Sequence, residues 1–157
     1  DVMHERGIET VLDTSGEALR QGLAGGNILL VKPSLGELSQ LVGHRLDDLN
    51  AITREAEAIV TAGKARMVAV TLGHRGAVLA SASGTAFIPA LPIEVRSAVG
   101  AGDSFLAAMV HALARGADAV EAFRAGVAAG SAAVLTPGTD LARPEDIARL
   151  LDDVIRP

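Results

Sequence analysis

The residue types most able to do chemistry lie together at residues 100–104, where the chain reads Gly-Ala-Gly-Asp-Ser. An extended segment precedes this turn, and an amphipathic run begins at Phe105. Glycines let the backbone bend tightly and approach a ligand closely, and free N–H groups at the start of a helix point at negative charge. We therefore expect an anion hole with the carboxylate of Asp103 against it. This arrangement suits phosphoryl transfer to a hydroxyl, because the hole stabilises negative charge while the carboxylate accepts the hydroxyl proton.

Simpler structural explanations compete for each candidate side chain. An Asp near the start of a helix, such as Asp103, is also favoured by capping and by the helix macrodipole. A Glu in a first helical turn, such as Glu37, is favoured by the same dipole. Lys32 follows a strand and could simply extend to water, and Asp13 stands in a turn-forming Asp-Thr-Ser-Gly sequence. The surroundings of each residue therefore decide between the two explanations.

The chain as a whole has the composition of one globular domain. Its 157 residues allow a substantial core, and 49% of them are hydrophobic. No apolar run approaches the roughly 18 residues of a membrane span, and the chain opens with mixed charge rather than a signal peptide. The lack of cysteine fits a reducing cytoplasm, while a net charge of −5 and the lack of Trp and Tyr argue against nucleic-acid binding. We expect a single cytoplasmic domain over residues 1–157 that binds neither nucleic acid nor a membrane.

Apolar runs and helical patterns alternate along the chain, which predicts an α/β fold with a mostly parallel sheet and helices on both faces. Strands are expected at residues 10–13, 27–32 and 67–72, followed by a hairpin of residues 76–81 and 86–88. Helices are expected over residues 15–22, capped by Ser15, and over residues 36–42, 48–62, 103–115, 119–136 and 144–154. The helix at 119–136 is dense in Ala and Gly and must pack closely. Ligands in such sheets bind beyond the carboxyl ends of the strands, where we expect Asp13, Lys32, Thr71 and Val99.

Four further segments have residue types that could do chemistry. Residues 31–37, Val-Lys-Pro-Ser-Leu-Gly-Glu, place a lysine and a carboxylate at a strand end. Residues 71–76, Thr-Leu-Gly-His-Arg-Gly, form a second glycine-rich turn at a strand end. Residues 128–133 form a helix face without bulk, and residues 136–139, Thr-Pro-Gly-Thr, form a turn just past it.

Together with Gly-Ala-Gly-Asp-Ser-Phe at residues 100–105, these segments resemble the C-terminal half of the PfkB, or ribokinase-like, family of sugar kinases. The resemblance covers essentially the whole chain in the family's order, and residues 12–19 and 126–133 are most similar to its phosphofructokinase branch. It implies a ribokinase-like three-layer α/β/α fold without the N-terminal half and β-sheet lid. It also implies ATP-dependent phosphoryl transfer to a phosphorylated ketohexose, with fructose 6-phosphate as the first candidate.

Other activities stay open at this point. The sugar-selective residues of the family lie mostly in the missing half, so 1-phosphofructokinase and tagatose-6-phosphate kinase activities are alternatives. A non-catalytic nucleotide-binding module that keeps the turn at residues 71–76 is an alternative of another class. A Rossmann-type dehydrogenase fits poorly, because no G-x-G-x-x-G follows the first strand.

The resemblance implies a role for each matched residue. Asp103 would be the catalytic base, beside the amides of Gly100, Ala101 and Gly102. Glu37 would hold magnesium through water, since that ion keeps much of its hydration, and Asp13 would lie near the phosphates. The residues that would contact or line the ATP site are Lys32, Ser34, Thr71, Leu72, Gly73, His74, Arg75, Gly76, Val95, Val127 and Ser131. The residues whose carbonyl groups would surround a monovalent cation, usually potassium, are Ser97, Val99, Ala133, Thr136 and Gly138.

Two positions depart from family patterns. Ser34 replaces the Asn of an Asn-x-x-Glu motif, and its hydroxyl is shorter and has one donor where an amide has two. Ser97 replaces the Asp that ribokinases carry, which favours the phosphofructokinase branch. The family's N-terminal half supplies most sugar contacts and the lid that usually makes a homodimer. We therefore expect a homodimer for the complete protein and no kinase activity for this chain alone, because substrate positioning supplies much of such an enzyme's rate.

Overall fold

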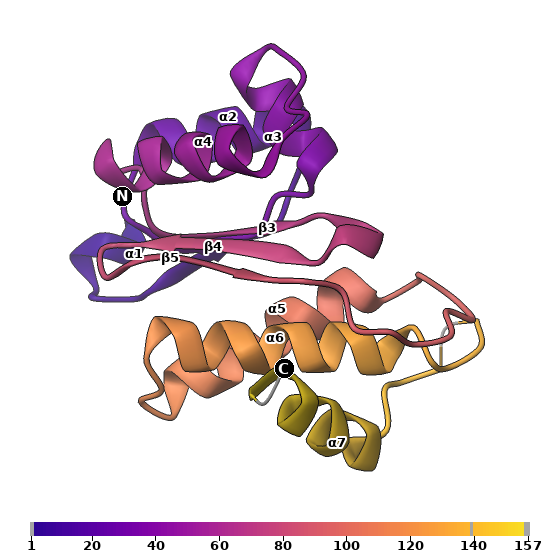
Figure 1. Ribbon diagram of the computed structural model, residues 1–157. Coiled ribbons are helices and arrows are strands. Elements are labelled where there is room, and N and C mark those ends of the chain that lie inside the picture. Colours follow the sequence, from indigo (N-terminus) through magenta and orange to yellow (C-terminus); the bar gives the residue numbers. More distant parts are fainter. Residues whose placement is uncertain (1, 139, 156–157) are drawn as a thin grey trace. The chain divides into compact units, whose positions relative to one another are not determined.

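The structure is a computed structural model that describes residues 2–138 and 140–155. The chain divides into two compact units (Figure 1). The first unit comprises residues up to Gly73 together with Ala77–Phe87, and the second comprises His74–Gly76 together with the residues from Ile88 onward.

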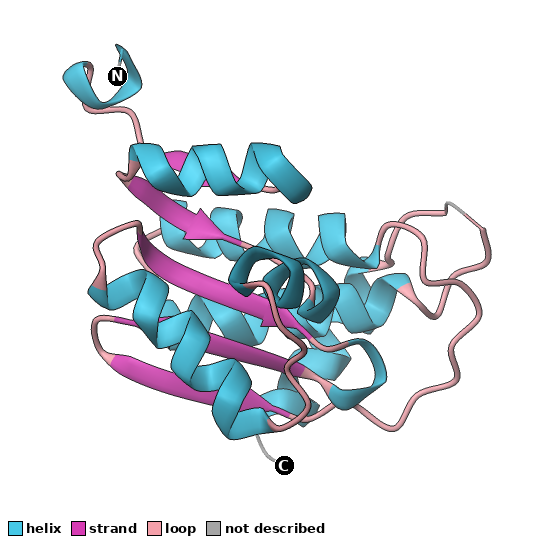
Figure 2. Cartoon of the chain, turned by 90° about the horizontal axis from the view of Figure 1, so that it is seen from above, coloured by secondary structure: helices cyan, strands magenta, loops and turns pink. Residues whose placement is uncertain are grey.

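The first unit is built on a mixed five-stranded sheet, whose strands lie side by side in Figure 2 in the order β1-β2-β3-β4-β5. The strands are β1 (Thr10–Leu12), β2 (Ile28–Val31), β3 (Ala65–Thr71), β4 (Ala77–Ser81) and β5 (Gly84–Ile88). β1, β2 and β3 are parallel, and β4 runs antiparallel to β3. Residues 82–83 join β4 to β5, as the predicted hairpin requires. The carboxyl ends of the parallel strands therefore meet at one edge.

Three helices cover one face of this sheet (Figure 1): α2 (Gly16–Gly25), α3 (Leu35–Val42) and α4 (Leu49–Thr61). In α4, Ile52, Ala56 and Ile59 recur at helical spacing and are buried. They join Leu38 of α3 and Val68 of β3 in one apolar core. This continuous core fixes the helices against the sheet whose strand ends carry candidate residues.

Several element ends differ from the prediction for local reasons. Ser15 occupies the N-cap of α2, but its side chain makes no capping hydrogen bond, and the helix continues to Gly25. A short helix, α1 (Val2–Glu5), was not predicted. Strands β1 and β2 stop one residue before Asp13 and Lys32, so both side chains stand just beyond the strand ends.

The second unit holds the helices α5 (Ala101–Ala114), α6 (Ala119–Ala133) and α7 (Pro144–Ile155). The predicted close packing of α6 is confirmed. A Cβ on Gly126 would lie 2.6 Å from Met109 Cγ, and one on Gly130 would lie 3.1 Å from the Ala101 carbonyl oxygen. On another side, α7 packs Leu150 against α6. As predicted, Pro144 is the first residue of α7, where its missing N–H costs nothing.

Two helix ends in this unit correct the prediction. α5 begins at Ala101 and not at Asp103, because Gly100 adopts a left-handed conformation (φ 78°) that starts the helix directly after it. α6 ends at Ala133 and not at Thr136. The Thr136 hydroxyl lies 2.8 Å from the Ala133 carbonyl oxygen, and Pro137 disfavours helical backbone at the residue before it. Among the described residues, no helix combines the length and apolar character needed to cross a bilayer.

Candidate active site

An ion pair between a buried lysine and a partly exposed aspartate lies where β1 and β2 end. Lys32 Nζ lies 3.2 Å from Asp13 Oδ1, and the two side chains are 9% and 32% exposed. The parallel register that pairs Leu12 with Val31 places these next residues side by side. An isolated buried charge is costly, and a close carboxylate offsets that cost. The alternative in which Lys32 extends to water is therefore wrong, while its contact with ATP stays a prediction.

The predicted nucleotide residues Ser34 and Thr71 are brought together at the neighbouring strand end. Thr71 N–H donates to the Pro33 carbonyl at 3.0 Å, and Ser34 and Thr71 form an isolated parallel bridge. The turn that starts α3 is thus fixed to the end of β3.

Ser34 and Glu37 form a capping box at the start of α3. Ser34 N–H donates to Glu37 Oε2 at 2.7 Å, and Glu37 N–H donates to Ser34 Oγ at 3.3 Å. The serine that departs from the family's asparagine therefore still caps the helix. Glu37 also has a structural role that does not depend on a ligand, and its second carboxylate oxygen is left for other partners.

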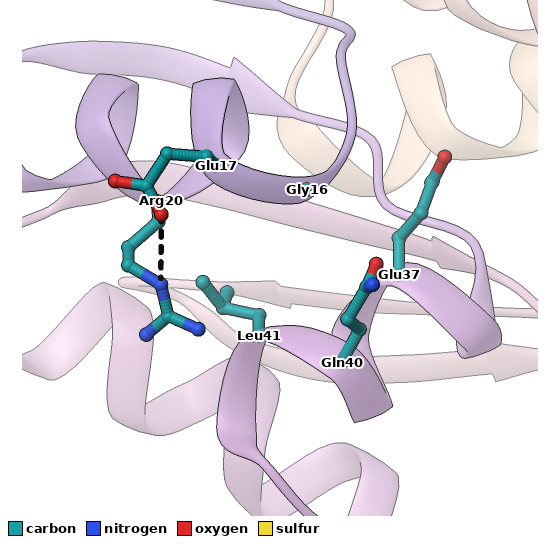
Figure 3. A pocket seen from close by; sticks show the side chains of 6 residues that line it. All are labelled: Gly16, Glu17, Arg20, Glu37, Gln40 and Leu41. Atoms are coloured by element: carbon teal, nitrogen blue, oxygen red, sulfur yellow. Dashed lines mark ion pairs between the residues drawn. The ribbon is translucent and has the colours of Figure 1, made fainter.

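Glu37 borders a pocket of about 190 Å³ between α2 and α3. Its lining residues are Gly16, Glu17, Arg20, Glu37, Gln40 and Leu41, of which the sequence pointed only to Glu37 as a site residue. Arg20 Nε lies 3.6 Å from Glu17 Oε2, and Figure 3 shows this pair on α2 opposite the three side chains of α3. Because Arg20 and Glu17 pair with each other, Glu37 is the charged lining residue without an ion-pair partner among the described residues, and it gives the pocket a net negative charge.

Residues 2–138 and 140–155 contain no group of three or more His, Cys, Asp or Glu side chains that could hold a metal ion. The resemblance assigns magnesium to one carboxylate, Glu37, and Glu17 lines the same pocket. Magnesium bound with substrate phosphates commonly uses only one or two protein carboxylates and several waters. The donor set fits that mode and does not fit a site built from protein ligands alone.

The glycine-rich turn at residues 71–76 begins at Thr71, the last residue of β3. Leu72 is buried, and the exposed residues Gly73 and His74 begin a 3₁₀ turn that ends at Arg75. Gly73 has a φ of 60°, which glycine adopts without strain. The turn thus exposes backbone together with side chains.

Asp103 is the third residue of α5. Its side chain is exposed, and the Ser104 N–H closes the first turn on the Gly100 carbonyl at 2.9 Å. Ala101 N–H donates to the Ala98 carbonyl at 3.4 Å, whereas the N–H groups of Gly100, Gly102 and Asp103 have no hydrogen-bond partner within the described part of the chain. Two of the three predicted amides are therefore free. The free amide of Asp103 itself was missed, although its place at a helix start was the signal for it.

The five predicted cation residues gather where residues 96–99 meet residues 133–138. Ser97 Oγ donates to the Gly138 carbonyl at 2.8 Å and accepts from Val99 N–H at 3.2 Å. The Ala133 carbonyl accepts both the hydroxyl of Thr136 at 2.8 Å and its N–H at 3.3 Å. A cation on that oxygen would displace one of them, whereas the Gly138 carbonyl keeps a lone pair. Thr139, which ends the predicted turn, lies outside the described residues.

Other groups in this region were not predicted from sequence. The Val134 carbonyl accepts from Arg96 N–H at 2.8 Å, and the Asp140 carbonyl lies 2.9 Å from Thr136 Oγ1. Every residue has a backbone carbonyl, so residue type does not indicate which carbonyls meet here. Only the path of the backbone could have identified these groups.

The three predicted lining residues of the nucleotide pocket differ in exposure. Val95 is 64% exposed on the segment before α5, Val127 is buried in α6, and Ser131 is partly buried one turn later on the same helix. Their contact with a nucleotide stays a prediction.

The chain matches proteins of known function. A family model described as pfkB family carbohydrate kinase matches residues 1–146. The chain is 43% identical over 146 residues to ATP-dependent 6-phosphofructokinase isozyme 2 of Escherichia coli K12, which covers 93% of this chain and 47% of that protein. It is 38% identical over 146 residues to 1-phosphofructokinase of Rhodobacter capsulatus, which covers 92% of this chain and 45% of that protein. The chain thus spans about half the length of these relatives.

Solved structures of related kinases also match this chain. Phosphofructokinase-2 from Escherichia coli in complex with substrates and products superposes with a TM-score of 0.94 at 41% identity, over 99% of this chain and 50% of that one. The same enzyme in complex with potassium gives a TM-score of 0.94 at 42% identity, over 98% and 50%. Arabidopsis thaliana ribokinase complexed with ribose and ATP gives 0.79 at 26% identity, over 94% and 48%. The fold is therefore ribokinase-like, as predicted, and the chain belongs to the pfkB family of carbohydrate kinases.

Proposed function

We propose that the complete protein containing this chain is an ATP-dependent kinase that converts fructose 6-phosphate to fructose 1,6-bisphosphate. The observation that carries the proposal is the Asp103 carboxylate, exposed at the start of α5 beside N–H groups that have no partner among the described residues. The 43% identity to a 6-phosphofructokinase supports the choice of reaction.

The chemistry divides between a base and an anion hole. The sugar hydroxyl oxygen attacks the γ-phosphorus of ATP, the bond from that phosphorus to the β–γ bridging oxygen breaks, and Asp103 accepts the hydroxyl proton. The free N–H groups of Gly100 and Gly102 face the negative charge that develops on the phosphoryl oxygens. The nucleotide is held by the turn from Thr71 to Gly76 together with Lys32, Ser34, Val95, Val127 and Ser131.

Two ions are part of the proposal. Glu37 would hold magnesium through water, and that ion would neutralise phosphate charge when bound. The carbonyl groups around Ser97 and Gly138 would hold potassium beside the anion hole. The resemblance of the chain to a phosphofructokinase-2 structure in complex with potassium supports this second site. We also propose that the complete protein is a cytoplasmic homodimer. Light scattering of the purified protein tests the dimer, and cell fractionation tests the location.

Fructose 1-phosphate is the second candidate substrate, because the chain is also 38% identical to a 1-phosphofructokinase. Coupled turnover of the complete protein on fructose 6-phosphate, fructose 1-phosphate and tagatose 6-phosphate separates the three activities. We expect the highest kcat/KM on fructose 6-phosphate and no turnover by residues 1–157 alone. ATP binding without turnover of any of these sugars would instead favour a nucleotide-binding module.

A further inference from the structure

Gly76 lies directly under the backbone of another segment. A Cβ on this residue would lie 2.0 Å from the Ile88 carbonyl oxygen, 2.7 Å from the Pro89 carbonyl carbon and 2.8 Å from Ala90 N. Non-bonded heavy atoms rest about 3.5–4.0 Å apart. All three neighbours are backbone atoms, which cannot rotate away as a flexible side chain can. Any side chain at this position must therefore displace residues 88–90.

The left-handed backbone of Gly76 does not by itself explain this contact. Gly84, at the start of β5, has a φ of +117°, close to the +107° of Gly76, yet a Cβ on Gly84 would meet nothing within 4 Å. Both glycines relieve backbone strain. Only Gly76 also permits a close approach, so the two positions form a matched pair.

The segment that crosses Gly76 leads to the candidate active site. β5 ends at Ile88, and the chain then runs through residues 89–100 to α5. Within the second unit, Leu91 and Ile93 pack against the apolar core shared by α6 and α7. Farther along, Arg96 N–H donates to the Val134 carbonyl at 2.8 Å. The segment is therefore fixed at its far end and rests on Gly76 at its near end.

We propose that Gly76 is a positioning residue. It fixes the distance between the end of the nucleotide turn, residues 74–76, and the segment of residues 88–100 that delivers Asp103. This inference rests on the proposed function, in which the turn holds ATP and Asp103 accepts the proton. A Cβ at residue 76 would move the crossing segment by more than about 1 Å if ordinary contact distances are restored. A misplacement of about 1 Å costs about 100-fold in rate.

The test compares Gly76→Ala with Gly84→Ala in the complete protein. We expect Gly76→Ala to lower kcat about 100-fold and to raise the KM for ATP, while the KM for fructose 6-phosphate stays unchanged. Gly84→Ala should leave all three constants at wild-type values. Partial unfolding of Gly76→Ala would lower kcat without changing either KM, so the split between the two substrates separates positioning from stability.

A second variant covers the case in which Gly76→Ala does not fold. Pro89 and Ala90 are exposed, and one glycine inserted between Ala90 and Leu91 is compatible with folding. It would leave the contact at Gly76 intact but uncouple it from the rest of the segment. We expect this variant to keep the wild-type melting temperature and to lose kcat. Wild-type kcat and ATP KM in the variants that fold would overturn the inference, whereas an inactive wild-type enzyme would overturn the proposed function on which it rests.

Discussion

Candidate residues of the first unit form ion pairs and hydrogen bonds with one another. The candidate residues at the start of α5, in the second unit, have an exposed carboxylate and N–H groups that are free among the described residues. Lys32 is buried against Asp13, and Ser34 and Glu37 cap the same helix reciprocally. Asp103 is exposed and has no such partner among the described residues. Groups that hold a ligand gain from being fixed in advance, while a base must be free to receive a proton. The difference fits the proposed division between groups that bind the nucleotide and the group that accepts the proton.

The largest expected effect is the loss of kcat on substitution of Asp103. Asp103→Asn keeps the shape of the side chain but cannot accept a proton, so kcat of the complete enzyme should fall about 100- to 10,000-fold. Asp146 is the matched control, because it is the third residue of α7 as Asp103 is of α5, and it pairs with Arg149 on an exposed surface. Steady-state kinetics should find Asp146→Asn as active as the wild type. Similar losses in both variants would mean that helix stability, and not catalysis, explains Asp103.

A smaller effect, on the free energy of unfolding, is expected from the ion pair between Asp13 and Lys32. Asp13→Asn leaves the Lys32 ammonium buried without a counter-charge. Its cost should be about 2 kcal/mol, below the about 3–5 kcal/mol of a fully buried pair because Asp13 is partly exposed. Lys32→Met should cost less than about 1 kcal/mol, since its apolar side chain fills the space and Asp13 can hydrate. Urea unfolding measures both, and equal losses would contradict a pair held together by burial of the lysine.

The smallest effect is expected at the capping box. Ser34→Ala removes the oxygen that accepts from Glu37 N–H, which should lower the free energy of unfolding by about 1 kcal/mol. Ser34→Asn restores a capping acceptor and should match the wild type in the same urea titration. If Ser34→Asn is as unstable as Ser34→Ala, the serine has a role other than capping.

The sequence was sufficient for features that depend on local pattern. The existence of strands just before Asp13 and Lys32, of a helix that carries Asp103 and of close packing in α6 follows from neighbouring residue types. The ion pair between Asp13 and Lys32 depends on the register of β1 against β2, which joins segments far apart in the chain. The contact of Gly76 with residues 88–90 depends on the path of a loop. Neither leaves a signal within one short window of sequence.

The ends of helices are also hard to predict from sequence. The apolar pattern of α6 continues past Ala133 through Val134 and Leu135, but the helix ends at Ala133, whose carbonyl accepts from the Thr136 hydroxyl ahead of Pro137. Likewise, the left-handed backbone of Gly100 starts α5 before the amphipathic pattern begins. Periodicity therefore located both helices and misplaced their ends.

The most direct test of the division between binding and reacting groups is calorimetric titration of ATP into the complete wild-type enzyme and its Asp103→Asn variant. If Asp103 acts on the sugar proton alone, the variant binds ATP at least as tightly as the wild type although its turnover is lost. A Kd for ATP that weakens by as much as kcat falls would make Asp103 a nucleotide-binding or structural residue and contradict the account.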